Sequence, residues 1–307
     1  MTRRSRGAPA SVPGASESGR PRVSVKSADT CAQPVRQSGD MKCTVITPVG
    51  PGHEQVAEAC RDSVIAAIRN HRGLFDEIEH CVVDDTSAKL GRGAARNGAV
   101  WRAAEAGSDW VFFLDADDLI CVDAFERVSP WISGYDAIWG AICEQRVESD
   151  DWRLRERQDL PITNLLEFLE FDPFYALQMG HFVRTSVARD NPFNPQMNAG
   201  EDFDYYLRIW TKYRCLKIGA PLFINRRWQH STGPRSASGH DWSRAIRRLR
   251  ARYLMDNRRE LRVLLRNRPG GVTRRDKWRL RRWQVTLVGA AWMRLRAWRP
   301  RRSAARR

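Results

Sequence analysis

The densest chemical signal in the sequence is a group of three aspartates that directly follows an apolar run. The run is WVFFL at residues 110–114, and Asp115, Asp117 and Asp118 come next, within four positions. Carboxylates packed together repel one another unless a cation lies between them. Mg²⁺ and Mn²⁺ use a few carboxylates together with substrate phosphate oxygens and water. These residues therefore indicate a divalent metal, Mg²⁺ or Mn²⁺, that clamps a diphosphate, with a solvated acidic turn as the simpler alternative.

Two further acidic pairs stand where they could contact a ligand. Asp84 and Asp85 follow a strand-like run, and a carboxylate at such a position can accept hydrogen bonds from a nucleobase or ribose. A turn cap is the alternative. Glu201 and Asp202 open a helical pattern, where a carboxylate can act as a general base. Helix N-capping is the alternative there, because acids suit the positive end of a helix dipole.

The elements that must position these acids alternate along the chain. Strand-like apolar runs occupy residues 43–47, 79–84 and 110–114, and helical spacing of apolar residues occurs at 55–69 and 94–106. This order predicts the α/β class, with a doubly wound, mostly parallel sheet flanked by helices. Such sheets bind ligands beyond the C-terminal ends of their strands. That edge is predicted to carry Thr47, Asp84, Asp85, Asp115, Asp117 and Asp118.

The middle of the chain is less regular but continues the pattern. It favours strands at 135–143 and 181–184 and helices at 164–170 and 200–211. A glycine-containing stretch at 91–98 is not a dinucleotide fingerprint, because Arg96 stands at the last glycine position and an acidic loop precedes it. Arg96 and Asn97 are better explained as groups that hold a phosphate or the loop of Asp85.

Several motifs together resemble a known family. V-I-T-P, V-V-D-D-T-S, A-A-R-N-G, F-L-D-A-D-D and G-E-D-F-D occur in the order and rough spacing of family 2 glycosyltransferases with the GT-A fold. The stretch R-R-W-Q-H-S at 226–231 is similar to the family's terminal basic-His-Ser element. The resemblance covers residues 42–236, and although each motif is weak, five in order are specific.

The resemblance implies roles for individual residues. Asp202 would be the catalytic base, and Asp117 and His230 would hold the metal or complete the diphosphate site. Thr47 and Pro48 would flank the nucleotide base, Asp85 would hydrogen-bond it, and Arg96 would support that pocket. The nucleotide-sugar site as a whole would comprise Thr47, Pro48, Asp85, Arg96, Asp115, Asp118 and Glu201.

Two departures from the family pattern keep other functions open. The chain has Val49-Gly50 where the family commonly has Tyr-Asn, so the identity of the donor is open. The stretch from Asp85 to Arg96 is short, and a strand and a helix are expected to be missing there. A non-catalytic binding module is therefore one alternative. A nucleotidyltransferase of related fold is another, although the loop at 49–53 has no Lys or Arg.

The charge is distributed unevenly over the 307 residues, whose formal net charge is +16. Residues 1–40 carry +4, residues 41–240 carry −7, and residues 241–307 carry +19. We therefore expect a disordered tail at 1–40, a GT-A domain at 41–236 and a basic amphipathic helical extension at 237–307. The tail is rich in Ser, Pro, Gly, Ala and Arg, and a start at Met41 would make it an artefact.

The basic extension indicates a partner with negative charge. Apolar residues recur at helical spacing from Trp242 to Leu254 and again at 277–298, opposite arginines. This pattern favours an anionic membrane surface contacted through 242–299. The alternatives are packing against the protein's own body and, less favoured, nucleic acid.

The resulting prediction is an enzyme rather than a structural protein. We expect a metal-dependent glycosyltransferase that uses a nucleoside-diphosphate sugar and a glycan or lipid-linked acceptor in cell-envelope or surface glycan synthesis, and the resemblance implies that it inverts the anomeric carbon. The segment 144–180 is expected to contact the acceptor. Seven dispersed cysteines and no bilayer-length apolar run favour a cytoplasmic protein, peripheral on the inner face of the cell membrane.

Overall fold

The computed structural model describes residues 41–146, 151–170, 176–197, 199–227 and 239–256, together with residues 259, 263, 266 and 267. The predicted tail at 1–40, the candidate ligand His230 and the second basic helix at 277–298 lie outside the described residues. Among the residues that are described, no helix combines the length and the apolar character needed to cross a membrane.

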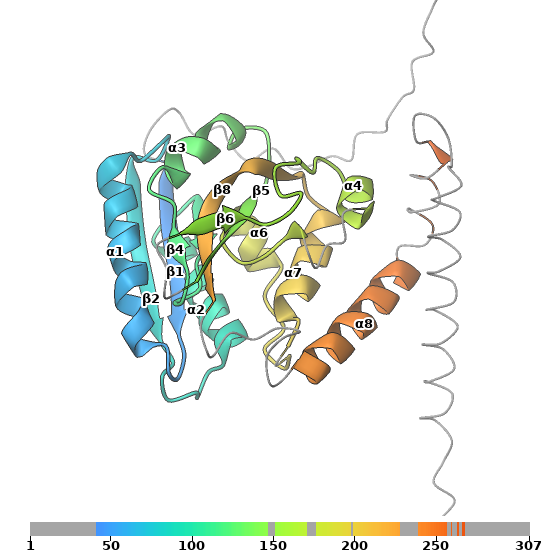
Figure 1. Ribbon diagram of the computed structural model, residues 1–307, viewed down its shortest axis with the longest axis horizontal. Helices are drawn as coiled ribbons and strands as arrows, with labels where there is room; N and C mark the ends of the chain where they lie inside the picture. The colour runs from blue at the N-terminus through green and yellow to red at the C-terminus, as the bar shows by residue number, and fades with distance from the viewer. Residues whose placement is uncertain are drawn as a thin grey trace, which may run out of the picture. The chain divides into compact units, whose positions relative to one another are not determined.

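An eight-stranded sheet forms the centre of the fold, with the main strand order β2-β1-β3-β7-β5-β8-β4 and β6 paired to β5 (Figure 1). The first half is parallel, because β1 pairs in parallel with both β2 and β3. Helices connect these strands, as the alternating pattern predicts. The elements are β1 (Lys42–Val49), α1 (Glu54–Asn70), β2 (Glu77–Asp84), α2 (Arg92–Glu105) and β3 (Trp110–Phe113).

The second half of the sheet is mixed. β7 runs antiparallel between β3 and β5, β8 runs parallel to β5, and β4 and β6 are short antiparallel additions. The predicted α/β class with a mostly parallel sheet is confirmed. The strand at 181–184 was predicted but its antiparallel direction was not, and β4, β6 and β8 were not predicted from the sequence. The strands are β4 (Leu119–Ile120), β5 (Ala137–Arg146), β6 (Trp152–Leu154), β7 (His181–Arg184) and β8 (Cys215–Arg227).

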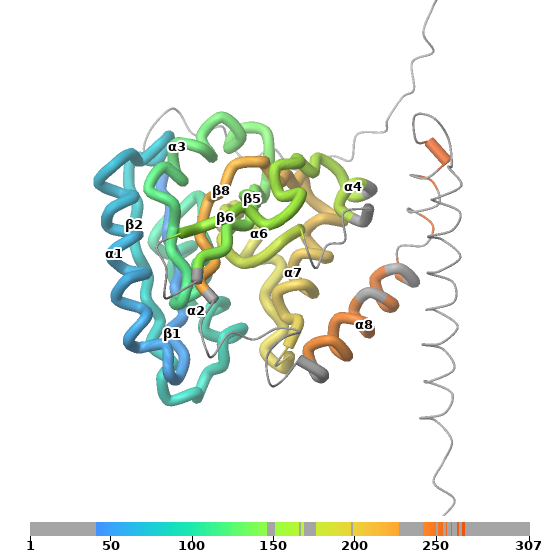
Figure 2. Tube along the Cα trace, viewed as in Figure 1, coloured from blue at the N-terminus to red at the C-terminus, as the bar shows by residue number. Residues whose placement is uncertain are grey.

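Helices cover both faces of the sheet. Successive side chains of each central strand point to opposite faces and both sets are apolar, so both faces have to be buried. Val45 and Phe112 pack with α1 residues in one core cluster, whereas Ile46 and Phe113 pack with residues of α2, α7 and α8 in the other. Figure 2 traces α7 and α8 side by side. The other helices of the described residues are α3 (Ala124–Val128), a 3₁₀ turn (Ser129–Trp131), α4 (Leu165–Glu170), α6 (Thr185–Asp190), α7 (Glu201–Trp210) and α8 (Gly239–Asp256).

The connection between β2 and α2 is short. β2 ends at Asp84 and α2 begins at Arg92, so a loop of seven residues joins them.

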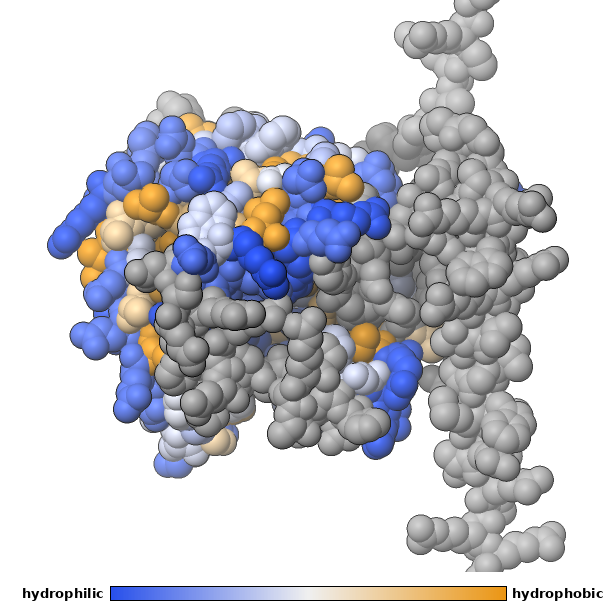
Figure 3. All heavy atoms as spheres, viewed as in Figure 1, coloured by the Kyte–Doolittle hydropathy of each residue, from blue (hydrophilic) through white to orange (hydrophobic). Residues whose placement is uncertain are grey.

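The described residues on the face in Figure 3 are mostly hydrophilic, with small separate apolar areas.

Candidate functional site

The three aspartates after β3 converge in space. The turn closes with a hydrogen bond from the Asp118 amide to the Asp115 carbonyl at 3.0 Å. One ligand atom from each of Asp115, Asp117 and Asp118 lies within 4.8 Å of the others, a spacing that could hold a metal ion. The apolar β3 strand thus delivers three carboxylates to one point.

Asp118 is the buried anchor of this group. Its Oδ1 accepts hydrogen bonds at 3.0 Å from the Asn225 side-chain amide and the Arg226 backbone amide, both on β8. Its Oδ2 is buried and has no hydrogen-bond partner in the described part of the chain. Burial, followed by the charges of Asp117 and Asp115, raises the pKa of Asp118 well above its usual range. Burial and Asp115 also raise the pKa of Asp117.

This electrostatic situation fits a divalent cation. A buried carboxylate oxygen without a partner, beside two further carboxylates, is unfavourable unless positive charge neutralises it. The donors of the three aspartates are all oxygens, which suits Mg²⁺ or Mn²⁺. The residues present therefore fit the metal that the sequence indicates.

Arg226 fixes the aspartate turn from the far end of β8. Its Nε donates to the Asp117 carbonyl at 2.8 Å, and its Nη2 donates to the Val56 carbonyl on α1 at 3.1 Å. Sequence reasoning placed Arg226 in a family motif but gave neither it nor Asn225 a role in the site. The signal that could have found them is their position at the start of that motif, with Asn225 directly before it and Arg226 as its first residue.

Arg96 links the aspartate turn to the start of α7. Its side chain is 3% exposed; Nη2 donates to Asp115 Oδ1 at 2.5 Å and Nη1 to Glu201 Oε1 at 3.4 Å. Arg92, one turn earlier on α2, places its Nε 2.9 Å from the same Glu201 oxygen. Burial opposes the charged form, but Asp115 and Glu201 raise the pKa of Arg96 above its usual value, so the guanidinium stays charged.

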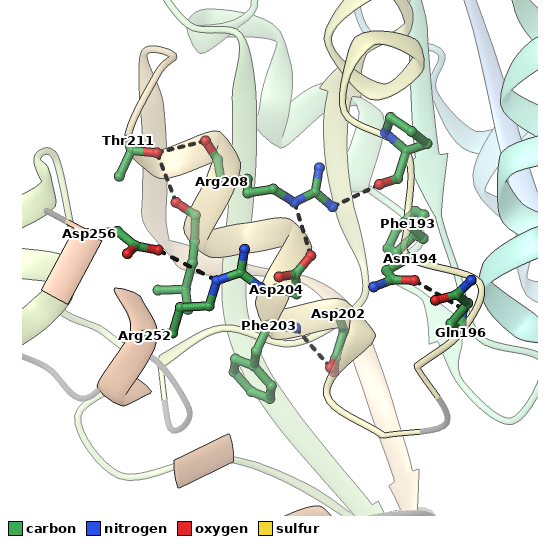
Figure 4. A network of polar contacts seen from close by, with 12 residues as sticks. Phe193, Asn194, Gln196, Asp202, Phe203, Asp204, Arg208, Thr211, Arg252 and Asp256 are labelled. Atoms are coloured by element: carbon green, nitrogen blue, oxygen red, sulfur yellow. Dashed lines mark hydrogen bonds and ion pairs between the residues drawn. The ribbon is translucent and has the colours of Figure 1, made fainter. Parts of the chain in front are cut away.

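Asp202 stands in the first turn of α7, beside the clamped Glu201. Its Oδ1 accepts the backbone amide of Phe203 at 2.8 Å, as Figure 4 shows. Burial and the neighbouring charge of Glu201 raise the pKa of Asp202 to about 7, against the opposing effects of the Phe203 amide, Arg92 and Arg96. A carboxylate with this pKa is suited to exchange protons near neutral pH.

Asp85 closes the loop between β2 and α2. It is 5% exposed, and its two carboxylate oxygens accept the backbone amides of Leu90 and Gly91 at 2.8 and 2.7 Å. Its own amide donates to the Val49 carbonyl at the end of β1. The Asp85 carboxylate therefore holds the entry to the helix that carries Arg92 and Arg96.

Thr47 and Pro48 occupy opposite faces of β1. Thr47 is 1% exposed, and its hydroxyl lies 3.0 Å from Nε2 of His80 on β2. Burial lowers the pKa of His80 to about 4, so this imidazole is neutral at physiological pH. The Thr47 side chain thus faces the interior, whereas Pro48 is half-buried.

The structure brings most of the predicted residues into one connected region. The Arg96 ion pairs join Asp115 to Glu201, which precedes Asp202, and Asp85 holds the start of the same α2 helix. Sequence reasoning missed two residues of this region. Arg92 pairs with Glu201, and the charge of His53 acts to lower the pKa of Asp117. Asn97 does not hold the Asp85 loop, because its side-chain amide pairs with the backbone of Phe193.

Comparisons with known proteins give structural likenesses alone. No protein-family model matches the chain, and no curated protein matches it. One similar solved structure is S. aureus TarS 1–349, which has been solved alone and in complex with UDP-GlcNAc. It is 16% identical to this chain, with a TM-score of 0.48. The match covers 70% of this chain and 66–67% of TarS 1–349. In a longer TarS structure the match covers 40% of that chain.

Two further solved structures show a similar likeness. Glucosyl-3-phosphoglycerate synthase from Mycobacterium tuberculosis, in complex with Mg²⁺ and UDP, is 14% identical with a TM-score of 0.35, covering 61% of this chain and 68% of that one. GalNAc-T7 with UDP, GalNAc and Mn²⁺ is 12% identical with a TM-score of 0.38, covering 64% and 46%. TarS, this synthase and GalNAc-T7 are GT-A glycosyltransferases, the class that the sequence motifs resemble. At these identities, the function of this chain has to be argued from its own residues.

Arg96→Met tests the ion pairs that connect the site. We expect the free energy of unfolding to fall by about 1–3 kcal/mol, because Asp115 loses its ion pair and the buried Glu201 keeps only its contact with Arg92 among those described. Urea unfolding followed by tryptophan fluorescence measures this loss. Arg102→Met, on the exposed side of the same helix, is the matched control, with an expected change within about 0.5 kcal/mol. An equally small loss for Arg96→Met would contradict the connecting role.

Asp118→Asn tests the charge conflict in the aspartate group. In chelator, the wild type should gain stability as the pH falls from about 8 to about 5. The carboxyls of Asp117 and Asp118 have raised pKa values in the folded protein, so they bind protons more readily there than in the unfolded chain. The variant keeps the oxygen that accepts Asn225 and Arg226, so it should be at least as stable as the wild type at pH 8 in chelator. It should also lose any rise in melting temperature caused by Mn²⁺. An unchanged Mn²⁺ response would show that Asp118 is not part of a cation site.

Proposed function

We propose that this chain is a metal-dependent, inverting glycosyltransferase that moves a sugar from a nucleoside-diphosphate sugar to an acceptor hydroxyl. The observation that carries the proposal is the Arg96 bridge between Asp115 in the cation-suited aspartate turn and Glu201, the neighbour of Asp202. A donor diphosphate and a general base would then share one site. The motifs that resemble family 2 glycosyltransferases support the same reading.

The metal would be held by the aspartate turn. Asp117 and Asp118 have raised pKa values in the absence of a cation, and Asp115 is held beside them by Arg96. A bound Mg²⁺ or Mn²⁺ supplies Lewis-acid stabilisation of the charge on a departing diphosphate. His230 is proposed as a further ligand on the resemblance alone.

Asp202 would take the proton from the acceptor. The hydroxyl oxygen forms a bond to the anomeric carbon while its proton passes to the Asp202 carboxylate. The bond from that carbon to the diphosphate oxygen breaks, and its electron pair leaves with the diphosphate, so the anomeric centre inverts. A pKa of about 7 leaves a useful fraction of Asp202 ionised near neutral pH and makes it a stronger base than an exposed carboxylate.

Glu201 would act by supporting Asp202. Arg92 and Arg96 hold its carboxylate at 2.9 and 3.4 Å, so the backbone that carries Asp202 is fixed. The charge of Glu201 also raises the pKa of Asp202. Thr47, Pro48, Asp85 and Asp118 complete the proposed donor site on the resemblance, with Asp85 acting at the start of α2.

The acceptor would be a glycan or lipid-linked molecule in cell-envelope or surface glycan synthesis, approached through the segment 144–180. The proposed location is the cytoplasm, peripheral on the inner face of the membrane. What supports a charged surface is α8, whose exposed residues include Arg244, Arg247, Arg248 and Arg252. The apolar residues of α8 pack in the core, so this helix would contact anionic headgroups electrostatically without inserting.

A non-catalytic binding module is the second candidate, favoured by the short connection between Asp84 and Arg92. Incubation with a panel of nucleotide sugars and acceptors, while nucleoside diphosphate release is measured, separates the two functions. Release that depends on an added acceptor supports the transferase. Tight nucleotide binding with no release from any donor supports the binding module.

Asp202→Asn tests the base. We expect kcat to fall by about 10²- to 10⁴-fold, because the amide cannot accept the acceptor proton, while nucleotide affinity stays within about twofold. Wild-type kcat/KM should also decline as the pH drops below about 7, where Asp202 becomes protonated. Asp190→Asn, at the exposed end of α6, is the control for the loss of one carboxylate. Turnover at the wild-type rate in Asp202→Asn would rule out this base.

Asp117→Ala tests the metal. We expect it to abolish the part of nucleoside-diphosphate affinity that depends on Mn²⁺ or Mg²⁺ and to leave affinity in chelator unchanged, because it removes a cation ligand and no nucleotide contact. Isothermal titration of UDP and GDP with and without metal measures both quantities. Affinity that still rises with metal in the variant would count against the aspartate turn as the clamp.

A further inference from the structure

The start of α7 rests directly against α8. Gly200, the residue before α7, is buried and adopts a left-handed conformation with φ of 78°, which suits glycine. A Cβ at this position would lie 3.0 Å from Leu249 Cδ1 and 3.3 Å from Ile246 Cδ1. The α8 side chains therefore leave no spare room over the backbone that leads into Glu201 and Asp202.

α8 is seated there by its apolar side. Ile246, Leu249 and Tyr253 are buried in the same core cluster as Phe203 of α7. The Trp242 ring meets the Phe203 ring edge to face, with centroids 6.2 Å apart. The contact between the two helices is thus a packed hydrophobic interface, and Phe203, the residue after Asp202, is part of it.

The opposite side of the same turn is held by charge. Glu201 is 2% exposed and is bound by Arg92 and Arg96 of α2. One turn further on, Asp204 and Arg208 form an ion pair, and Arg208 also donates to the Pro192 carbonyl (Figure 4). Asp202 therefore lies between Glu201, which α2 holds through ion pairs, and Phe203, which packs against α8.

We propose that α8 is a positioning element for Asp202, in which Leu249 and Ile246 hold Gly200 and the first turn of α7 in the geometry that catalysis requires. This inference rests on the proposed function, since it concerns the residue assigned as the base. It makes the first helix of the basic C-terminal segment part of the catalytic unit. The exposed arginines of α8 are not involved in this role.

Leu249→Ala and the milder Ile246→Val test the proposal in the full-length protein. The space opened beside Gly200 should let the first turn of α7 shift and admit water near Asp202. We expect kcat to fall about tenfold to a hundredfold for Leu249→Ala, with the donor KM within about twofold, because small displacements of a catalytic group are costly. Ile246→Val should show a smaller effect in the same direction, and Leu249→Met should restore kcat.

A second readout does not depend on activity. Among the described residues, the charges that act on Asp202 are Glu201 on its own helix and Arg92 and Arg96 on α2, and no substitution in α8 changes them. Burial is the largest cause of the raised Asp202 pKa, so hydration should bring that pKa down from about 7 towards its usual value. Carbon-13 NMR titration of the Asp202 carboxyl, assigned with Asp202→Asn, measures this shift.

Asp256→Asn, at the exposed C-terminal end of α8, is the matched control and should change neither readout. A purely structural role for Leu249 would lower the melting temperature but leave kcat and the Asp202 titration unchanged at a permissive temperature, and that result would overturn the proposal. Absence of transferase activity in the wild type would refute the proposed function instead. The Asp202 titration would still report whether α8 positions this carboxyl.

Discussion

The buried ion pairs of Arg96 are the interaction on which the rest of the site depends. A guanidinium that is almost fully buried can persist only if carboxylates neutralise it, because desolvating an unpaired charge is very unfavourable. Asp115 and Glu201 meet that need from positions 19 residues later and 105 residues later in the chain. The end of β3, the α2 helix and the start of α7 are consequently held in one arrangement, and none of the three can move without exposing a charge that has lost its partner.

The fold treats its carboxylates in two different ways. Asp115 and Glu201 are neutralised internally by arginines, and Asp85 is satisfied by two backbone amides. Asp118, in contrast, is buried with one oxygen unpartnered among the described residues, beside Asp117 and Asp115. The protein thus keeps a concentrated negative charge at one point while removing it elsewhere. That contrast is the physical reason to place a cation at the aspartate turn and to regard Asp202, with its pKa near 7, as a separate proton-accepting group.

The amphipathic character of α8 has a different use from the one its sequence first indicates. An arginine-rich helix with an apolar stripe favours a membrane surface, yet the stripe of α8 packs on α7 and on Gly200. Packing against the protein's own body, one of the alternatives open from the sequence, is therefore what the structure shows for this helix. Arg247 and Arg248 are exposed on the other face of this helix, which is the face that the proposed contact with an anionic surface would use.

The sequence by itself determined the strands and helices from β1 to β3 and the aspartate turn at the end of β3, because local periodicity encodes which side of each element is buried. It also indicated that the acids of β2 and β3 lie at one sheet edge, since parallel strands end together. Only the tertiary structure decided that Arg96 meets Glu201, that Asn225 and Arg226 anchor Asp118, that Thr47 faces His80, and that β7 runs antiparallel between β3 and β5. Each of these depends on a pairing between distant segments. A residue's own neighbours in the sequence specify that it must be buried or paired, but the partner is selected by how the whole sheet and its helices pack together.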